Sequence, residues 1–110
     1  MAIARKIDPA ALARRVADDL RDVPEVKRLW YHARPGLLDP EFLSVGFYFL
    51  VDSDTKAAQS AIVDALERVQ IQYFDETSVS AEIVPQWDLE ERGLDNILVD
   101  GSIEIPLPRS

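Results

Sequence analysis

The sequence predicts one small α+β domain in which a mixed β-sheet packs against helices. Apolar residues recur at helical spacing in two long stretches, and they alternate in several shorter stretches that turn residues separate. The predicted order is α-β-β-α-β-α-β, with three to four strands, two main helices and one short helix. A chain of 110 residues is long enough for one hydrophobic core and too short for two.

The composition is that of a globular protein, with 47% hydrophobic and 29% charged residues. The chain contains no cysteine, which excludes disulfides and zinc–thiolate sites. No stretch approaches the roughly 18 apolar residues of a membrane helix, and no apolar run follows the basic N-terminus as it would in a secretory signal. We therefore expect a cytoplasmic domain without membrane contact and without a cofactor.

The net charge of −8 is unevenly distributed along the chain. Residues 1–34 carry a net charge of +3 from eight basic and five acidic residues, and residues 35–110 carry −11 from four basic and fifteen acidic ones. An acidic surface repels phosphate backbones, so nucleic acid is an unfavourable partner. The basic residues of the first third are expected to solvate the outer face of a helix.

The first helix is expected to follow a flexible basic tail at residues 1–7. Asp8 is suited to cap its free amides, and Pro9 is suited to its first position. An apolar stripe repeats every four residues through Leu12, Val16 and Leu20. After Pro24, residues 26–33 form an aromatic-rich strand, and residues 34–40 form a loop rich in proline and glycine.

The second strand, residues 42–51, gives the clearest alternation in the chain. One face carries Leu43, Val45, Phe47, Phe49 and Val51. The other face carries Phe42, Tyr48 and Leu50, together with Ser44 and Gly46. A strand that is apolar on both faces is usually central and covered on both sides.

The rest of the chain alternates helices and short strands. Residues 52–54 offer candidate caps for a second helix, whose apolar stripe runs from Ala58 to Val69, and residues 71–74 fit either helix or strand. Residues 75–77 form a turn, and residues 79–83 alternate in a third strand that stops at Pro85.

Asp88 and Glu91 have the spacing of a capping box, which predicts a short helix that Gly93 ends or bends before residues 94–98. Asp100 and Gly101 form a turn, residues 102–105 form a final strand, and residues 106–110 form a flexible tail. One domain thus spans residues 1–110.

Four residues are candidates for ligand or ion binding, and each also has a structural interpretation. His32, the only histidine, is either a proton carrier or a strand histidine satisfied by its surroundings. Asp52 and Asp54 follow an apolar strand and are either ligands for a divalent ion or helix caps, which we favour. Glu82 is either a base or an exposed strand carboxylate. The sequence has no glycine-rich phosphate loop and no nucleophile elbow, so it predicts no catalytic residue.

The element order resembles that of the minimal nucleotidyltransferases of the DNA polymerase β superfamily from about Asp8 to Ile105. In that family, two strands follow a leading helix, and the third strand precedes a short leucine-rich helix and a glycine-led strand. Residues 79–84, 94–98 and 100–105 have the corresponding patterns here.

The catalytic motifs of that family are missing from the matching positions. Residues 31–34, Tyr-His-Ala-Arg, occupy the place of its phosphate-binding Gly-Ser pair, and residues 44–49 contain neither of its two metal-binding acids. Only Glu82 matches its third carboxylate. Since a lone carboxylate cannot build a two-metal site, the resemblance implies a degenerate relative without the activity.

The leading hypothesis is a non-catalytic protein-interaction or regulatory domain. The alternatives are a nucleotide-binding or nucleotidyl-transfer enzyme that uses Asp52, Asp54 and Glu82 with His32, or a dimerising ferredoxin-like sensor. Clustering of these residues would favour the enzyme. A homodimer or another protein partner is expected, because the short segment from Leu89 to Leu98 is too small to cover the second sheet face. The candidate interface consists of large apolar residues, namely Trp30, Phe42, Tyr48, Leu50 and Trp87.

Overall fold

A computed structural model describes residues 8–36, 42–73 and 77–108. Outside these ranges lie residues 1–7, 37–41, 74–76 and 109–110. They include the predicted N-terminal tail, most of the predicted loop and the start of the predicted turn after the second helix. The elements in chain order are α1 (Pro9–Asp19), β1 (Val26–Pro35), β2 (Leu43–Val51), α2 (Lys56–Gln72), β3 (Thr77–Pro85), α3 (Gln86–Arg92), α4 (Leu94–Ile97) and β4 (Ile103–Ile105). The predicted α+β class and element order are confirmed, with the short helix divided in two.

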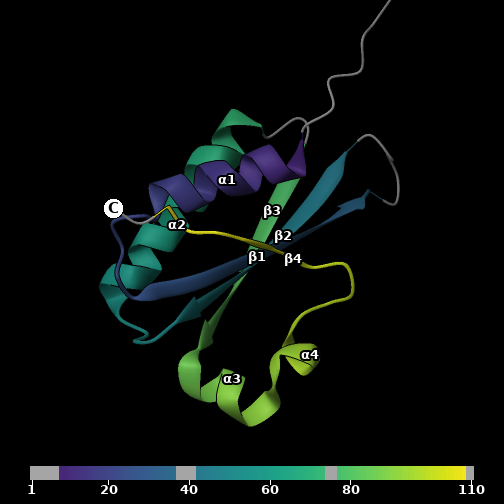
Figure 1. Cartoon of the computed structure of the whole chain (residues 1–110). Coiled ribbons are helices and arrows are strands. Elements are labelled where there is room, and N and C mark those ends of the chain that lie inside the picture. The colour runs from purple at the N-terminus through teal and green to yellow at the C-terminus, as the bar shows by residue number, and fades with distance from the viewer. Residues whose placement is uncertain (1–7, 37–41, 74–76, 109–110) are drawn as a thin grey trace, which may run out of the picture.

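The four strands form one mixed sheet in the order β3-β2-β1-β4 (Figure 1). β1 pairs antiparallel with β2 and with β4, whereas β2 pairs parallel with β3 across the α2 crossover. One row of residues crosses the whole sheet, running from Glu82 through Tyr48 and Trp30 to Glu104. β3 is therefore one edge strand, and the three-residue β4 is the other.

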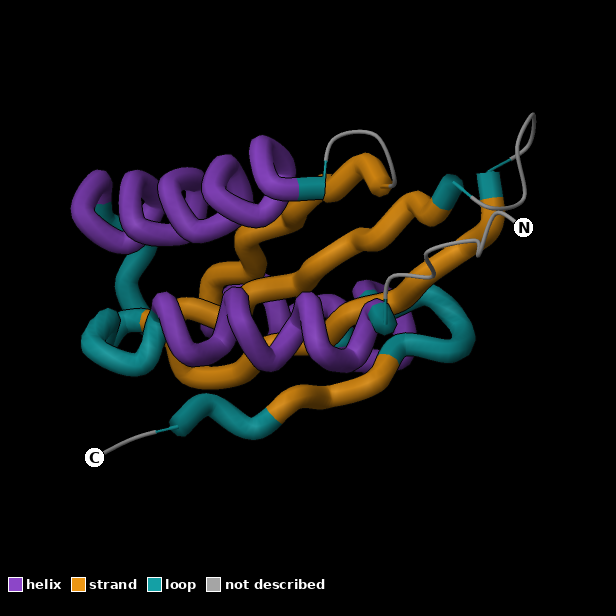
Figure 2. Tube along the Cα trace, turned by 90° about the horizontal axis from the view of Figure 1, so that it is seen from above, coloured by secondary structure: helices purple, strands orange, loops and turns teal. Residues whose placement is uncertain are grey.

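The first face of the sheet carries the larger core. Figure 2 shows α1 and α2 lying across this face. Their apolar stripes pack on the alternate residues of β2 that the sequence placed on one face: Val45, Phe47, Phe49 and Val51. Phe47 and Phe49 are at most 1% exposed. Leu107 packs against this cluster, a contact that the predicted C-terminal tail did not include.

The second face is covered at one end by α3 and α4, on the side opposite the long helices (Figure 1). A smaller buried cluster lies there, comprising Trp30, Tyr48, Leu50, Val84 and Ile97. Leu89, Leu94 and Leu98 pack against it. The segment from Leu89 to Leu98, expected to be too small for this face, thus covers its buried strand residues, because these number only four.

The helix ends confirm one predicted cap and correct two. The Asp8 carboxylate accepts a hydrogen bond from the Ala10 amide at 3.0 Å, as expected. The cap of α2 is Thr55, whose hydroxyl accepts from the Ala58 amide, so Asp52 and Asp54 are not the caps. The predicted capping box of α3 was wrong, because α3 begins at Gln86 without a side-chain cap.

No helix in the three described ranges is long and apolar enough to cross a membrane.

Candidate functional site

His32 lies on β1 with its imidazole ring over Gly46 of β2, its register partner. A Cβ atom at position 46 would overlap the His32 Nε2 atom, so the missing side chain of Gly46 is what accommodates the ring. The ring also lies 5.7 Å from that of Tyr48, between centroids. His32 is thus held by packing against two residues of β2.

The electrostatic environment of His32 favours its neutral form. Burial of the ring and the nearby positive charge of Arg34 lower the pKa of His32 from its ordinary value. The buried Nδ1 atom has no hydrogen-bond partner within the described residues. His32 therefore lacks the oriented partner that a catalytic imidazole usually has.

Asp52 and Asp54 lie in the short connection between β2 and α2, and each contacts a neighbour. The Asp52 carboxylate lies 3.4 Å from the Lys27 ammonium group, and the Asp54 carboxylate accepts a hydrogen bond from the Gln59 side chain at 2.8 Å. Both interactions are exposed to solvent, which limits their contribution to stability.

Glu82 lies in the middle of β3 with its side chain exposed. Its carboxylate is 3.6 Å from the Arg92 guanidinium group, which donates two shorter hydrogen bonds, at 2.7 and 2.8 Å, to Asp88. Glu82 is therefore the outer member of a trio of two carboxylates and one guanidinium, with a net charge of −1.

The structure does not bring the four predicted residues together. β2 separates His32 from Glu82 by two strand spacings, about 10 Å. His32 pairs with Gly46, so Asp52 lies six residues further along the sheet, roughly 20 Å away. Within residues 8–36, 42–73 and 77–108, no group of three or more His, Cys, Asp or Glu side chains is arranged to hold a metal ion.

The five residues of the predicted interface have different surroundings. Trp30, Tyr48 and Leu50 are at most 8% exposed and lie beneath α3 and α4, so in a single chain they offer no surface to a partner. Arg28 also stacks 4.5 Å from the Trp30 ring. Phe42 is half-buried, whereas Trp87 is 65% exposed on α3.

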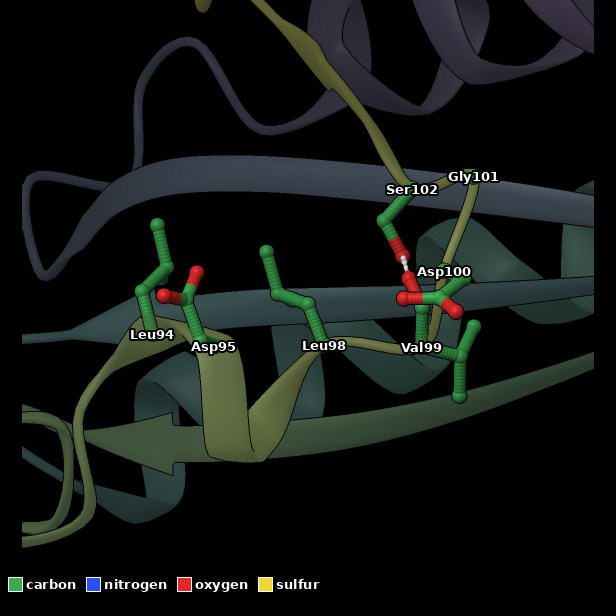
Figure 3. Close-up of a pocket in the computed structure, with 7 residues that line it drawn as sticks. All are labelled: Leu94, Asp95, Leu98, Val99, Asp100, Gly101 and Ser102. Atoms are coloured by element: carbon green, nitrogen blue, oxygen red, sulfur yellow. Dashed lines mark hydrogen bonds between the residues drawn. The ribbon is translucent and has the colours of Figure 1, made fainter.

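A pocket of about 290 Å³ lies between α4 and the turn that leads into β4 (Figure 3). Leu94 and Leu98 supply its apolar side, and Asp95 and Asp100 supply carboxylates. The hydroxyl of Ser102 donates to the Val99 carbonyl at 2.7 Å. None of the four predicted binding residues lines this pocket. Of its lining residues, the sequence predicts a turn only for Asp100 and Gly101.

The outer edge of β3 carries an arrangement that the sequence did not indicate. The Gln70 side chain of α2 donates a hydrogen bond to the Thr77 carbonyl and accepts one from the Val79 amide, both at 2.9 Å. A side-chain amide thus pairs with two backbone groups of an edge strand as a neighbouring strand would. No sequence signal distinguishes Gln70 from an ordinary solvated glutamine, because the contact depends on the α2 crossover.

Comparisons with known proteins leave the family open. No family model and no curated protein matches the chain. A solved structure of Era, in complex with MgGDPNP and part of 16S ribosomal RNA, aligns with a TM-score of 0.37 and 19% identity. The alignment covers 73% of this chain and 32% of the Era chain. A TM-score of this size does not establish a shared fold.

Proposed function

We propose that this chain is a non-catalytic protein-interaction domain that binds an extended segment of a partner along β3. The observation that carries the proposal is the open edge of this strand. β3 has nine residues, and no strand of the described residues pairs with its outer side. Strand addition to such an edge supplies main-chain hydrogen bonds that any extended segment can make.

Edge strands are usually protected by charged side chains, above all lysine, by proline or a bulge, or by being very short. β3 has no lysine, its single charged residue is Glu82, and its only proline, Pro85, lies at its last position. Its middle residues, Ser80, Ala81 and Glu82, are all exposed. The middle of this edge, around Ala81, is therefore accessible to a second chain.

The scatter of His32, Asp52, Asp54 and Glu82 supports the interaction domain over the enzyme that would use them together. We expect at most weak nucleotide binding and no magnesium-dependent nucleotidyl transfer. Calorimetric titration with ATP and magnesium measures this. A micromolar affinity that is lost in Glu82→Ala would instead favour the enzyme. The resemblance to nucleotidyltransferases remains a prediction from the sequence.

The test of the proposed function uses proline to block the edge. We expect short random peptides displayed on phage to be enriched on the wild-type protein, and the Ala81→Pro variant to lose about tenfold in affinity for them, because proline removes an outward N–H. Ala81→Thr, which keeps the N–H, is the matched control. Equal binding to the proline variant, or no enrichment on the wild type, would contradict the proposal.

The predicted homodimer also remains a prediction. Light scattering over a dilution series at micromolar concentration measures it, and a monomer mass throughout would exclude it. Three of the five residues that motivated it are buried within the chain.

A further inference from the structure

The hydrogen bonds of Gln70 show which backbone groups of β3 point outward. The Thr77 carbonyl and the Val79 amide face Gln70, and alternate residues of a strand direct these groups to the same side. The N–H and C=O groups of Ala81 and Ile83 therefore also point outward. They have no partner in the described part of the chain. Gln70 thus closes the first part of the edge and leaves the part from Ala81 to Ile83 open.

Helix and strand repeats place an exposed apolar side chain of α2 near the open part. Val63 is 49% exposed and is seven residues before Gln70, so the two share one strip of α2. Because β2 and β3 are parallel, the helix α2 that connects them runs antiparallel to β3. Residues before Gln70 on α2 are therefore level with residues after Val79 on β3. Val63 lies about 10 Å along the helix from Gln70. Ile83 lies about 13 Å along the strand from Val79. Val63 is thus level with the open groups.

At the level of the open part, the second face of the sheet is negatively charged. The side chain of Glu82 points to the second face of the sheet, where Tyr48 is its register partner. The trio of Glu82, Asp88 and Arg92 retains one uncompensated negative charge. A strand added antiparallel to β3 would place one side chain directly opposite Glu82, with Cβ atoms about 5 Å apart.

We propose that the open part of β3, Ala81 to Ile83, receives an extended segment of another protein with the pattern apolar–basic–apolar. This inference rests on the proposed function and specifies its partner. The basic residue faces Glu82 on the second face. The two apolar residues pair with Ala81 and Ile83 and lie on the α2 side, where Val63 is exposed.

A second copy of the chain fits this edge poorly. Identical strands pair antiparallel about a two-fold axis. An axis at Glu82 uses only the open groups, but it places Glu82 directly opposite Glu82 of the copy, and like charges so placed are destabilising. An axis at Ala81 pairs Val79 with Ile83, and it requires the Val79 amide to leave Gln70.

Two labelled peptides of alternating valine and threonine test the inference, one with a central valine–lysine–valine triplet and one with valine–glutamate–valine. We expect the lysine peptide to bind about threefold to tenfold more tightly, measured by fluorescence anisotropy. NMR shift changes should centre on the amides of Ala81 and Ile83. Glu82→Gln should reduce the preference for the lysine peptide. Asp18→Asn, an equal change of charge at an exposed position of α1, should preserve this preference.

The apolar contact has its own matched pair of variants. Val63→Ser should lower the affinity for the lysine peptide about threefold, because the half-exposed valine would be covered in the complex. Ile103→Ser should leave its affinity unchanged, because Ile103 is equally exposed, at 52%, on β4 at the other edge of the sheet.

The possible failures are distinguishable. If no peptide binds in an Ala81-dependent manner, both the proposed function and this inference are wrong. If Ala81-dependent binders exist but lysine and glutamate peptides bind equally, only the inference is wrong. If light scattering shows a dimer that Ala81→Pro dissociates, the occupant is a second copy and the inference is overturned.

Discussion

A methyl group at position 46 tests the packing between β1 and β2 on the second face of the sheet. Gly46 lies within β2 and has no positive φ, so the backbone accepts alanine without strain. The obstacle is the His32 ring, which an added Cβ would overlap. We therefore expect Gly46→Ala to destabilise the fold through this one contact.

The magnitude follows from two opposing effects. Overpacking costs about 1–3 kcal/mol. Alanine in a strand is otherwise favoured over glycine by about 0.5–1 kcal/mol. The His32 ring is only half-buried, so it can rotate away from Gly46 and give up its contact with Tyr48. We expect a net loss of about 1 kcal/mol in the free energy of unfolding.

A double-mutant cycle measured by urea unfolding isolates this contact. In a His32→Ala background the obstacle is gone, and Gly46→Ala should be neutral or stabilise by up to about 1 kcal/mol. The coupling between the two sites should therefore be about 1–2 kcal/mol. If Gly46→Ala has the same effect in both backgrounds, the ring is not what limits position 46, and our description of this contact is wrong.

Three further substitutions test other parts of the structure. Phe47→Ala should cost about 3–5 kcal/mol, because Phe47 is 1% exposed between the sheet and the long helices, and an unchanged melting curve would refute this. Thr55→Ala should cost about 1 kcal/mol through loss of the α2 cap, and Thr55→Ser should restore most of it in chemical unfolding. Arg28 donates two hydrogen bonds to Glu104, and these lower the pKa of Glu104. The pair therefore stabilises the fold at pH values above the ordinary glutamate pKa, and this contribution is lost as the pH falls from there through the lowered pKa of Glu104. Melting temperatures of Glu104→Gln should therefore depend less on pH between neutral and acidic buffers than those of the wild type, and parallel curves would contradict the assignment.

Local patterns predicted most elements because each depends on neighbours in sequence. Asp8 and Pro9 fix the start of α1 by their own chemistry, and the alternation in β2 identified both faces of the sheet correctly. The cover of the second face was missed for a physical reason. Gly93, with φ of 80°, divides the segment into two short helices, and the surface that they cover together depends on this bend rather than on the spacing within either helix.

The candidate site was harder to predict, because long-range geometry decides it. The four titratable residues were chosen by type, and the sheet register places them apart. Gln70 was overlooked because its role comes from an edge strand that follows it in the chain. Its helix neighbours give no indication that its amide binds backbone groups.

The pairing of β1 with β4 has a consequence for how the chain folds. Arg28 and Glu104, which join these strands, are 76 residues apart. Closing so long a loop is slow, so β4 should pair after the β1–β2 hairpin has formed. Until then the backbone groups of β1 around Trp30 and Tyr31 are unpaired on one side, and unpaired strand edges of different chains associate with one another. Refolding yield should therefore fall as the protein concentration rises, and slow dilution from urea should recover it.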